Sequence, residues 1–139
     1  MKVLFDTNVV LDVLLAREPH FEVAARLFSL VDNKAIDGLI CATTVTTIHY
    51  LAAKAVGAKK AATHVRALMA LFEVAPVSRA VLAGAMERGF DDFEDALLHE
   101  AALLSGATAI VTRNGKDFAK AALPVFEPVA LLAAVASTR

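Results

Sequence analysis

Side chains that can bind a metal ion through oxygen gather at three places in this chain of 139 residues. The first is Asp6-Thr7-Asn8, directly after an apolar run; the second is the acidic run 91–95; the third is the polar segment 112–118. Oxygen ligands without a His or Cys cluster select Mg²⁺ or Mn²⁺ over zinc. Such a site suits hydrolysis of a phosphodiester bond, because the cation generates hydroxide and stabilises the charge of the in-line transition state.

Each of these segments also has a purely structural interpretation. Asp6 or Asn8 suits the cap of a following helix, and Asn114 could cap a helix or form a turn with the next glycine. Asp92 and Asp95 have the spacing of a helix cap and its partner three residues on. One cap needs one or two carboxylates, however, and four fall within five residues here. Because like charges repel at this density, we favour a functional role for the acidic run.

The elements that must position these residues alternate along the chain. Strands are predicted at 3–5, 39–42, 72–75, 109–111 and 125–126; helices are predicted at 9–16, 21–33, 43–56, 59–71, 78–88, 91–105, 114–120 and from 128 onward. This alternation indicates an α/β fold, a single domain over residues 1–139 with a mainly parallel sheet of about five strands and helices on both faces. Ligands of such sheets bind beyond the carboxyl ends of the strands. We therefore expect Asp6, Asp95, Asn114 and Asp117 on one rim of the sheet.

Composition restricts the functional classes. The formal net charge is −1 and 58% of residues are apolar. A protein that grips nucleic acid by phosphate contacts alone usually carries a basic excess, so local geometry, bound cations or a partner would have to replace it. A nearly neutral, apolar-rich surface also favours self-association.

Cysteine use and hydropathy indicate the compartment. Cys41 is the single cysteine, so an intramolecular disulfide and a Cys-rich zinc site are excluded, and its apolar neighbours predict a buried, inert thiol. The sequence has neither an 18-residue apolar stretch free of charges nor a signal-peptide pattern. We therefore expect a cytoplasmic protein without membrane association.

Taken together, the three polar segments resemble the PIN domain family, the ribonuclease fold of bacterial VapC-type toxins. The resemblance rests on Asp6-Thr7-Asn8 after a strand, on Asp95-Ala96-Leu97, and on the segment from Val111 to Phe118, in this order over nearly the whole chain. It implies a PIN-like domain acting as a Mg²⁺- or Mn²⁺-dependent endoribonuclease that leaves a 5′-phosphate and a 3′-hydroxyl. It also implies a toxin-antitoxin pair, in which a toxin homodimer is inhibited by a small antitoxin protein.

In that family up to four acids hold the metal, and the resemblance carries over to only part of the set. Asp6 and Asp95 match the first and third acids, whereas Thr47 stands where a Glu is usual and Asn114 where an Asp is usual. We expect Asp6 and Asp95 to be the metal ligands, with Asn114 and Asp117 assisting. The loss of two charges should weaken the metal site, since ligands must balance the cation's charge.

Neighbouring polar residues complete the predicted site. Asp92, Glu94, Asp117 and Asp12 are candidates to replace the missing carboxylates. Of these, Asp117 is the one we expect to bind the metal and Asp92 the one we expect beside it, with Asn8 near both. Arg113 is predicted as a substrate contact.

Other assignments are weaker alternatives. A receiver domain needs a phosphoacceptor Asp after its third strand, but the chain has no Asp between residues 37 and 91. A haloacid-dehalogenase-like phosphatase needs a second Asp where Asn8 stands. Within the PIN resemblance, the missing carboxylates at Thr47 and Asn114 leave open a degenerate, non-catalytic domain that binds RNA or protein.

Three further side chains have both a functional and a structural interpretation. His99 follows Asp95 by one helical turn and could orient its carboxylate, but a surface or half-buried histidine is the simpler interpretation. Tyr50 and Phe93 are predicted to belong to the core rather than to platforms on which bases stack.

Overall fold

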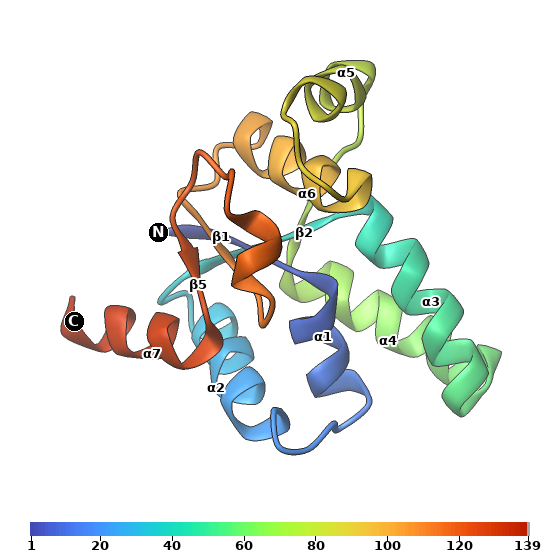
Figure 1. Cartoon of the computed structure of the whole chain (residues 1–139). Helices are drawn as coiled ribbons and strands as arrows, with labels where there is room; N and C mark the ends of the chain where they lie inside the picture. The colour runs from blue at the N-terminus through green and yellow to red at the C-terminus, as the bar shows by residue number, and fades with distance from the viewer. Residues whose placement is uncertain (139) are drawn as a thin grey trace.

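A parallel sheet of five strands forms the centre of the molecule. The computed structural model describes residues 1–138 and contains β1 (Lys2–Phe5), β2 (Asp37–Cys41), β3 (Glu73–Ala75), β4 (Ala109–Val111) and β5 (Val125–Phe126). The strand order is β3-β2-β1-β4-β5, and every neighbouring pair is parallel (Figure 1). The predicted α/β class is thus confirmed, and the sheet is wholly parallel within the described residues.

Helices connect the strands. They are α1 (Thr7–Leu14), α2 (Phe21–Asp32), α3 (Ala42–Val56), α4 (Ala58–Leu71), α5 (Arg79–Glu87), α6 (Phe93–Leu104) and α7 (Pro128–Ser137). The helix predicted at 114–120 is only a short 3-10 helix, η1 (Gly115–Phe118). None of the helices in residues 1–138 is long and apolar enough to cross a membrane.

Alternation along the strands divides the core into two clusters, one on each face of the sheet. Val3 and Phe5 of β1 belong to one cluster, with side chains from α1, α2, α3, α4 and α7. Leu4 belongs to the other, with side chains from α5, α6 and η1. Because successive side chains of a strand point to opposite faces, the apolar runs bury both faces and helices cover both, as predicted.

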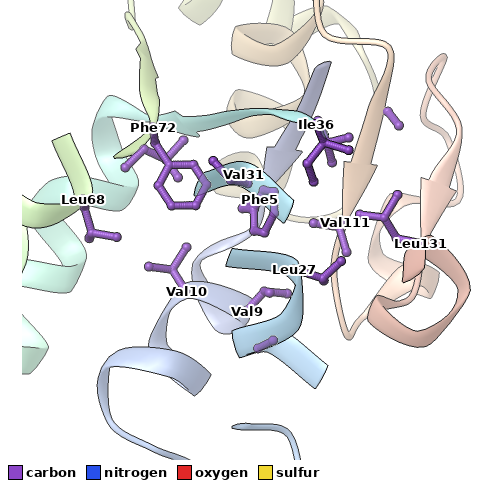
Figure 2. Packing of buried hydrophobic residues seen from close by; sticks show 14 of the residues in the cluster. Phe5, Val9, Val10, Leu27, Val31, Ile36, Leu68, Phe72, Val111 and Leu131 are labelled. Atoms are coloured by element: carbon purple, nitrogen blue, oxygen red, sulfur yellow. The ribbon is translucent and has the colours of Figure 1, made fainter. Parts of the chain in front are cut away.

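Three aromatic rings hold the first cluster together near the end of β1. Phe5 packs edge-on against Phe28 and Phe72, with ring centroids 6.0 and 5.0 Å apart, beside Val111 (Figure 2). Gly38 leaves room for Phe72, because a Cβ at this position would lie 2.6 Å from the Phe72 ring. This packing fixes the end of β1, which the polar residues follow.

The register of the sheet brings the carboxyl ends of β1 and β4 level with each other. Phe5 of β1 is paired with Val111 of β4. The Asp6 backbone N–H donates to the Val111 carbonyl oxygen at 3.0 Å, which extends the ladder by one bond. Asp6 and Thr112, 106 residues apart, therefore leave the sheet side by side.

Candidate active site

Asp6 lies at the centre of the rim, with only 7% of its surface exposed. It is the N-cap of α1: its Oδ1 accepts the Thr7 backbone N–H at 2.7 Å. Its Oδ2 accepts the Thr112 hydroxyl at 2.7 Å. The capping interpretation is therefore correct, and it does not compete with a functional one, because the same carboxylate faces the rim.

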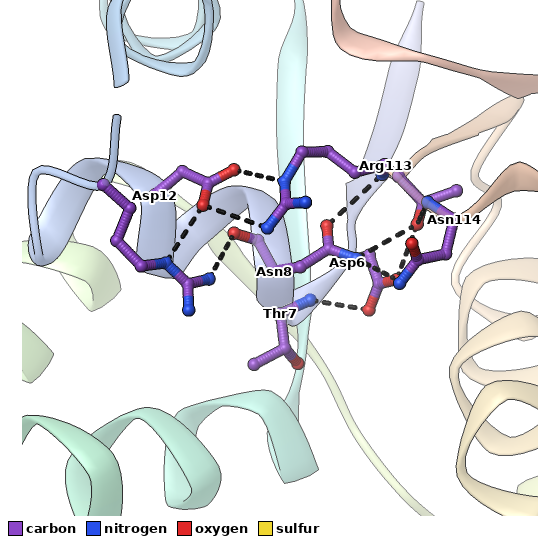
Figure 3. A network of polar contacts seen from close by, with 8 residues as sticks. Asp6, Thr7, Asn8, Asp12, Arg113 and Asn114 are labelled. Carbon is purple, nitrogen blue, oxygen red and sulfur yellow. Dashed lines mark hydrogen bonds and ion pairs between the residues drawn. The ribbon is translucent and has the colours of Figure 1, made fainter. Parts of the chain in front are cut away.

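Asn8 and Thr112 join Asp6 to the loop after β4 (Figure 3). The Asn8 amide Nδ2 donates to Asp6 Oδ2 at 3.3 Å and to Thr112 Oγ1 at 3.4 Å. Asn8 Oδ1 accepts the Arg113 backbone N–H at 3.3 Å. Asn8 therefore lies beside Asp6, as predicted. Thr112 was not predicted as a site residue, since a Thr after a strand is ordinary in sequence.

A second polar cluster lies behind the first and contains two arginines. The Asp12 side chain, 1% exposed, accepts Arg17 Nε at 3.1 Å through Oδ1 and Arg113 Nε at 2.6 Å through Oδ2 (Figure 3). Arg113 Nη2 adds a bond to Asp12 Oδ1 at 3.3 Å, and Arg17 Nη2 donates to the Asn8 carbonyl oxygen at 3.2 Å. Asp12 is thus neutralised by arginines and does not replace a missing metal ligand. The ion pair with Asp12 also occupies the guanidinium of Arg113, which we predicted to contact the substrate.

The remaining carboxylates act on one another through space. The pKa of Asp95, a half-buried residue, is raised from 3.8 to about 7 by burial and by the negative charges of Asp92, Asp6, Asp117 and Glu94. Burial also raises the pKa of Asp6, against the hydrogen bonds from Thr112 and the Thr7 backbone, and the charge of Asp117 adds to the rise. Asp6, Asp95 and Asp117 therefore share one negative field, as their predicted place on one rim requires.

The acidic run 91–95 has the predicted capping role, and Asp95 has the predicted place near the other carboxylates. Asp92 is the N-cap of α6, and its Oδ1 accepts the Asp95 backbone N–H at 3.0 Å. Asp91, Asp92 and Glu94 are exposed, whereas Asp95 is not. Capping therefore explains Asp92. Asp95 is the member of the run whose pKa is raised, by burial and by the neighbouring carboxylates.

Two positions lack the carboxylates that the family resemblance expects. Asn114 precedes η1 without a side-chain cap bond, and its backbone N–H donates to Thr112 Oγ1 at 3.0 Å. Thr47 is half-buried on α3. On the same helix, the buried Thr44 shares a hydrogen bond of 2.9 Å with the Thr7 hydroxyl, which ties α3 to the rim.

The atoms at the rim are of a kind that binds divalent cations, but they are not gathered closely around one point. Its donors are hard oxygens, and burial together with the charges of neighbouring carboxylates raises the pKa of Asp95, so a bound cation would be favourable there. Within residues 1–138, however, no three His, Cys, Asp or Glu side chains lie close enough together to hold a metal ion. Two of these carboxylates with water ligands would suit Mg²⁺, which keeps several waters when bound.

His99 takes part in a separate buried network and does not orient Asp95. Its Nε2 accepts the Ala122 backbone N–H at 2.9 Å, so its Nδ1 carries the proton and donates to Glu100 Oε2 at 2.8 Å. Glu100 in turn accepts Arg88 Nε and Nη2 at 3.0 and 3.2 Å. The histidine is fully buried, contrary to the surface or half-buried role predicted for it. Burial lowers its pKa, against the hydrogen bond to Glu100.

The two aromatic residues predicted in the core are exposed. Tyr50 is 59% exposed, with the Lys54 ammonium 4.7 Å from its ring centroid, and Phe93 is 48% exposed. Their neighbours Ile48 and Leu97 are buried instead. Cys41 is buried, as predicted.

Comparison with protein families and known proteins gives consistent matches. The model of a family described as "PIN domain" matches residues 2–116. Ribonuclease VapC1 of Aquifex aeolicus (strain VF5) is 26% identical over 122 residues, which cover 84% of this chain and 83% of the relative.

Solved structures share the fold at low sequence identity. VapBC2 from Rickettsia felis, solved bound to a DNA fragment from its promoter, matches with a TM-score of 0.71 and 16% identity over 91% of this chain and 98% of that one. A toxin-antitoxin complex from Klebsiella pneumoniae matches with a TM-score of 0.68 and 23% identity over 91% and 97%.

Proposed function

The chain belongs to the PIN domain family, and on that premise we propose that it is a divalent-metal-dependent endoribonuclease, the toxin of a toxin-antitoxin pair. The observation that carries the proposal is the shared negative field of Asp6, Asp95 and Asp117 at the carboxyl edge of the sheet. A relative of similar length named as a ribonuclease supports the reaction class.

We infer that Asp6 and Asp95 bind the cation and that Asp117 and the Asn114 amide assist through water ligands, since no three carboxylates of residues 1–138 gather around one point. When bound, Mg²⁺ or Mn²⁺ supplies positive charge to the scissile phosphate and acidifies a water molecule. Thr112, Asn8 and the Thr7 backbone N–H hold both oxygens of Asp6 in place.

Asp95 is the carboxyl of this site that we expect to change its protonation near neutral pH. With a pKa of about 7, it holds a proton in roughly half of the molecules near neutral pH when no cation is bound. Its proton must leave before both of its oxygens can act as ligands. We therefore expect cation binding to release a proton and to strengthen as the pH rises through about 7.

A partner protein follows from the same premise. Two of the structural neighbours are complexes of a toxin-antitoxin type, which supports a small antitoxin as the inhibitor of this chain in the cytoplasm. We further propose a homodimer. It is supported by large apolar side chains left exposed on the helices, among them Met69, Leu82 and Met86, and by the net charge of −1.

A non-catalytic PIN domain that binds RNA or protein is the second candidate. It is favoured by the neutral residues Thr47 and Asn114 and by the lack, within residues 1–138, of three ligand side chains gathered around one point. The double variant Thr47→Glu, Asn114→Asp discriminates between the two. A large gain of cleavage over a nearly inactive parent would identify a crippled site.

Cleavage of a mixed RNA pool with Mg²⁺ or Mn²⁺ tests the proposal directly. We expect metal-dependent cleavage by the parent protein and none by Asp6→Asn or Asp95→Asn. Asp91→Asn is the matched control, because Asp91 is exposed and does not contribute to the raised pKa of Asp95. Absence of cleavage with either metal, in folded protein free of an inhibitor, would favour the binding module.

A further inference from the structure

A small cleft opens beside the loop that carries Arg113 and Asn114. It lies between the turn that precedes α2, the end of β4 and the start of α7, and it has a volume of about 260 Å³. Figure 1 shows α7 running beside α2 on the side of the molecule where this turn lies. Arg113 lines the cleft and also belongs to the polar cluster behind Asp6. The cleft therefore adjoins the loop that carries Asn114, through Arg113.

Arg113 gives the cleft a fixed planar group. Two bonds to Asp12, of 2.6 and 3.3 Å, hold its guanidinium, and 26% of the side chain remains exposed. Because its Nε and Nη2 already donate to Asp12, this arginine lacks that edge for a bidentate bond to a phosphate. Arginine planes also stack on unpaired nucleobases in RNA recognition, and a guanidinium held in one orientation loses little entropy in doing so.

The other walls are mainly apolar, apart from His20, which precedes α2. They include Pro19 and Val23 from the α2 side and Pro128 and Val129 from the start of α7. Val129 is 66% exposed, so a large part of this wall is open to a ligand. Pockets that accept whole drug-sized molecules measure roughly 300–1,000 Å³. The cleft is below that range and suits a single flat ring system.

Glu127 supplies the polar group that can read the edge of such a ring. It is the N-cap residue of α7 by position, but its carboxylate makes no cap bond, and it forms no hydrogen bond or ion pair with side chains of residues 1–138. Glu127 Oε1 lies 3.5 Å from the point where a Cβ at Gly115 would stand, so this carboxylate lies between the cleft and the site loop. An ionised carboxylate only accepts hydrogen bonds. Guanine offers two adjacent N–H donors on its Watson–Crick edge, which match two carboxylate oxygens.

We propose that this cleft binds one unpaired nucleobase of the RNA, with a preference for guanine, next to the bond that is cut. The proposal rests on the ribonuclease function proposed above and adds a determinant of its sequence preference. Phosphate binding is disfavoured there by Glu127 and by the paired state of Arg113. An unpaired base brings no charge of its own and can enter from single-stranded RNA.

Binding and cleavage together test the cleft. The binding assay uses Asp6→Asn protein without divalent cations and fluorescent single-stranded hexaribonucleotides that carry one guanosine, adenosine or cytidine in a uridine background. We expect the guanosine oligomer to bind about tenfold or more tightly than the others, and Glu127→Gln to remove this preference, since a bidentate base contact contributes about this much. Val129→Trp, which fills the cleft, should weaken binding of every oligomer.

Matched controls separate the cleft from general changes in charge and bulk. Glu87→Gln removes an exposed carboxylate on α5, and Leu104→Trp adds the same ring at an exposed position on α6. Neither should change RNA binding. The same four substitutions in the parent protein are then compared by mapping cleavage sites in an RNA pool. There Glu127→Gln should lose the enrichment of guanosine beside the cut.

The outcomes distinguish this proposal from the proposed function. If the parent protein cleaves no RNA but guanosine-dependent binding is lost in Glu127→Gln, the cleft is supported and the nuclease is not. If the parent cleaves RNA and Glu127→Gln and Val129→Trp bind and cut the same sites equally well, the cleft proposal is overturned. A peptide would then be the better candidate for its occupant.

Discussion

Replacement of Thr112 by Val tests how the central carboxylate is held. The Thr112 side chain is fully buried, and its hydroxyl donates to Asp6 Oδ2 at 2.7 Å while it accepts the Asn114 backbone N–H at 3.0 Å. Valine keeps the shape but removes the donor. A hydrogen bond to a charged group contributes about 1.5–3 kcal/mol. We therefore expect the free energy of unfolding to fall by about 2 kcal/mol near neutral pH, and Tm to fall by roughly 6–10 °C for a chain of this size.

The loss should depend on pH in a defined direction. Burial already raises the pKa of Asp6, and the Thr112 hydrogen bond is the largest influence that lowers it. Its removal raises the pKa of Asp6 further. A carboxyl whose folded-state pKa lies above its unfolded value destabilises the fold at high pH, and the penalty disappears as the pH falls. The difference between parent and variant should therefore become smaller as the pH falls, which a comparison at about pH 8 and about pH 4 measures.

Urea unfolding followed by circular dichroism measures both effects, since the chain lacks tryptophan but is rich in helix. Thr108→Val is the matched control. Thr108 is exposed, and its hydroxyl bonds only to backbone groups of Lys2, at 3.1 Å. It should cost less than about 1 kcal/mol at either pH. Equal losses in the two variants, or a loss in Thr112→Val that does not change with pH, would refute the assignment of Thr112 as the residue that holds ionised Asp6.

Three further changes have defined outcomes. Asp95→Asn should raise the stability of the cation-free protein above pH 7, because the folded-state pKa of about 7 makes the parent lose stability as the pH rises from 3.8 toward 7. Thermal unfolding in chelator at two pH values measures this. If the pKa were not shifted, the difference in Tm between parent and variant would be the same at both pH values. His99→Leu leaves the Ala122 backbone N–H without a partner and removes one donor to Glu100, which keeps Arg88, so it should cost about 1–3 kcal/mol. It should also remove the loss of stability that a lowered His99 pKa produces as the pH falls below 6.5, which acid titration of unfolding would detect. Gly84→Ala places a Cβ 2.5 Å from Glu100 Oε1 and should cost about 1–3 kcal/mol in urea unfolding, unless Glu100 can turn aside without losing Arg88.

The sequence predicts the sheet well because its signals are local. Each strand contains a short apolar run, and the two strands that carry the site are followed by a polar residue, Asp6 after β1 and Thr112 after β4. Parallel strands then bring distant ends to one edge without further information. Helix bounds are less exact for the same reason. The cap at Asp6 makes α1 begin at Thr7, two residues before Val9, where the apolar pattern begins.

Contacts between residues far apart in the sequence could not be predicted from local patterns. Asp12 and Arg113 are 101 residues apart, and each alone suggests a different role, a replacement ligand for one and a substrate contact for the other. His99 has helical spacing to Asp95, yet its ring follows the backbone N–H of Ala122, 23 residues further on. Tyr50 is exposed although it lies two residues from buried Ile48, since packing of α3 against its neighbours decides which face is covered.

The charge of the rim decides between the two candidate functions. The charge of Asp117 adds to the raised pKa of Asp6, and the charges of Asp6 and Asp117 add to that of Asp95, while Arg113, the arginine that acts on Asp6, is already bound to Asp12. The field can be relieved either by a proton on Asp95 or by a divalent cation, and these two compete. A nuclease should therefore gain activity steeply as the pH rises through about 7, and higher cation concentrations should shift that rise to lower pH. RNA binding through the cleft beside Glu127 involves neither event. A protein that binds RNA with no such coupling between pH and cation would use the PIN fold as a binding module and not as an enzyme.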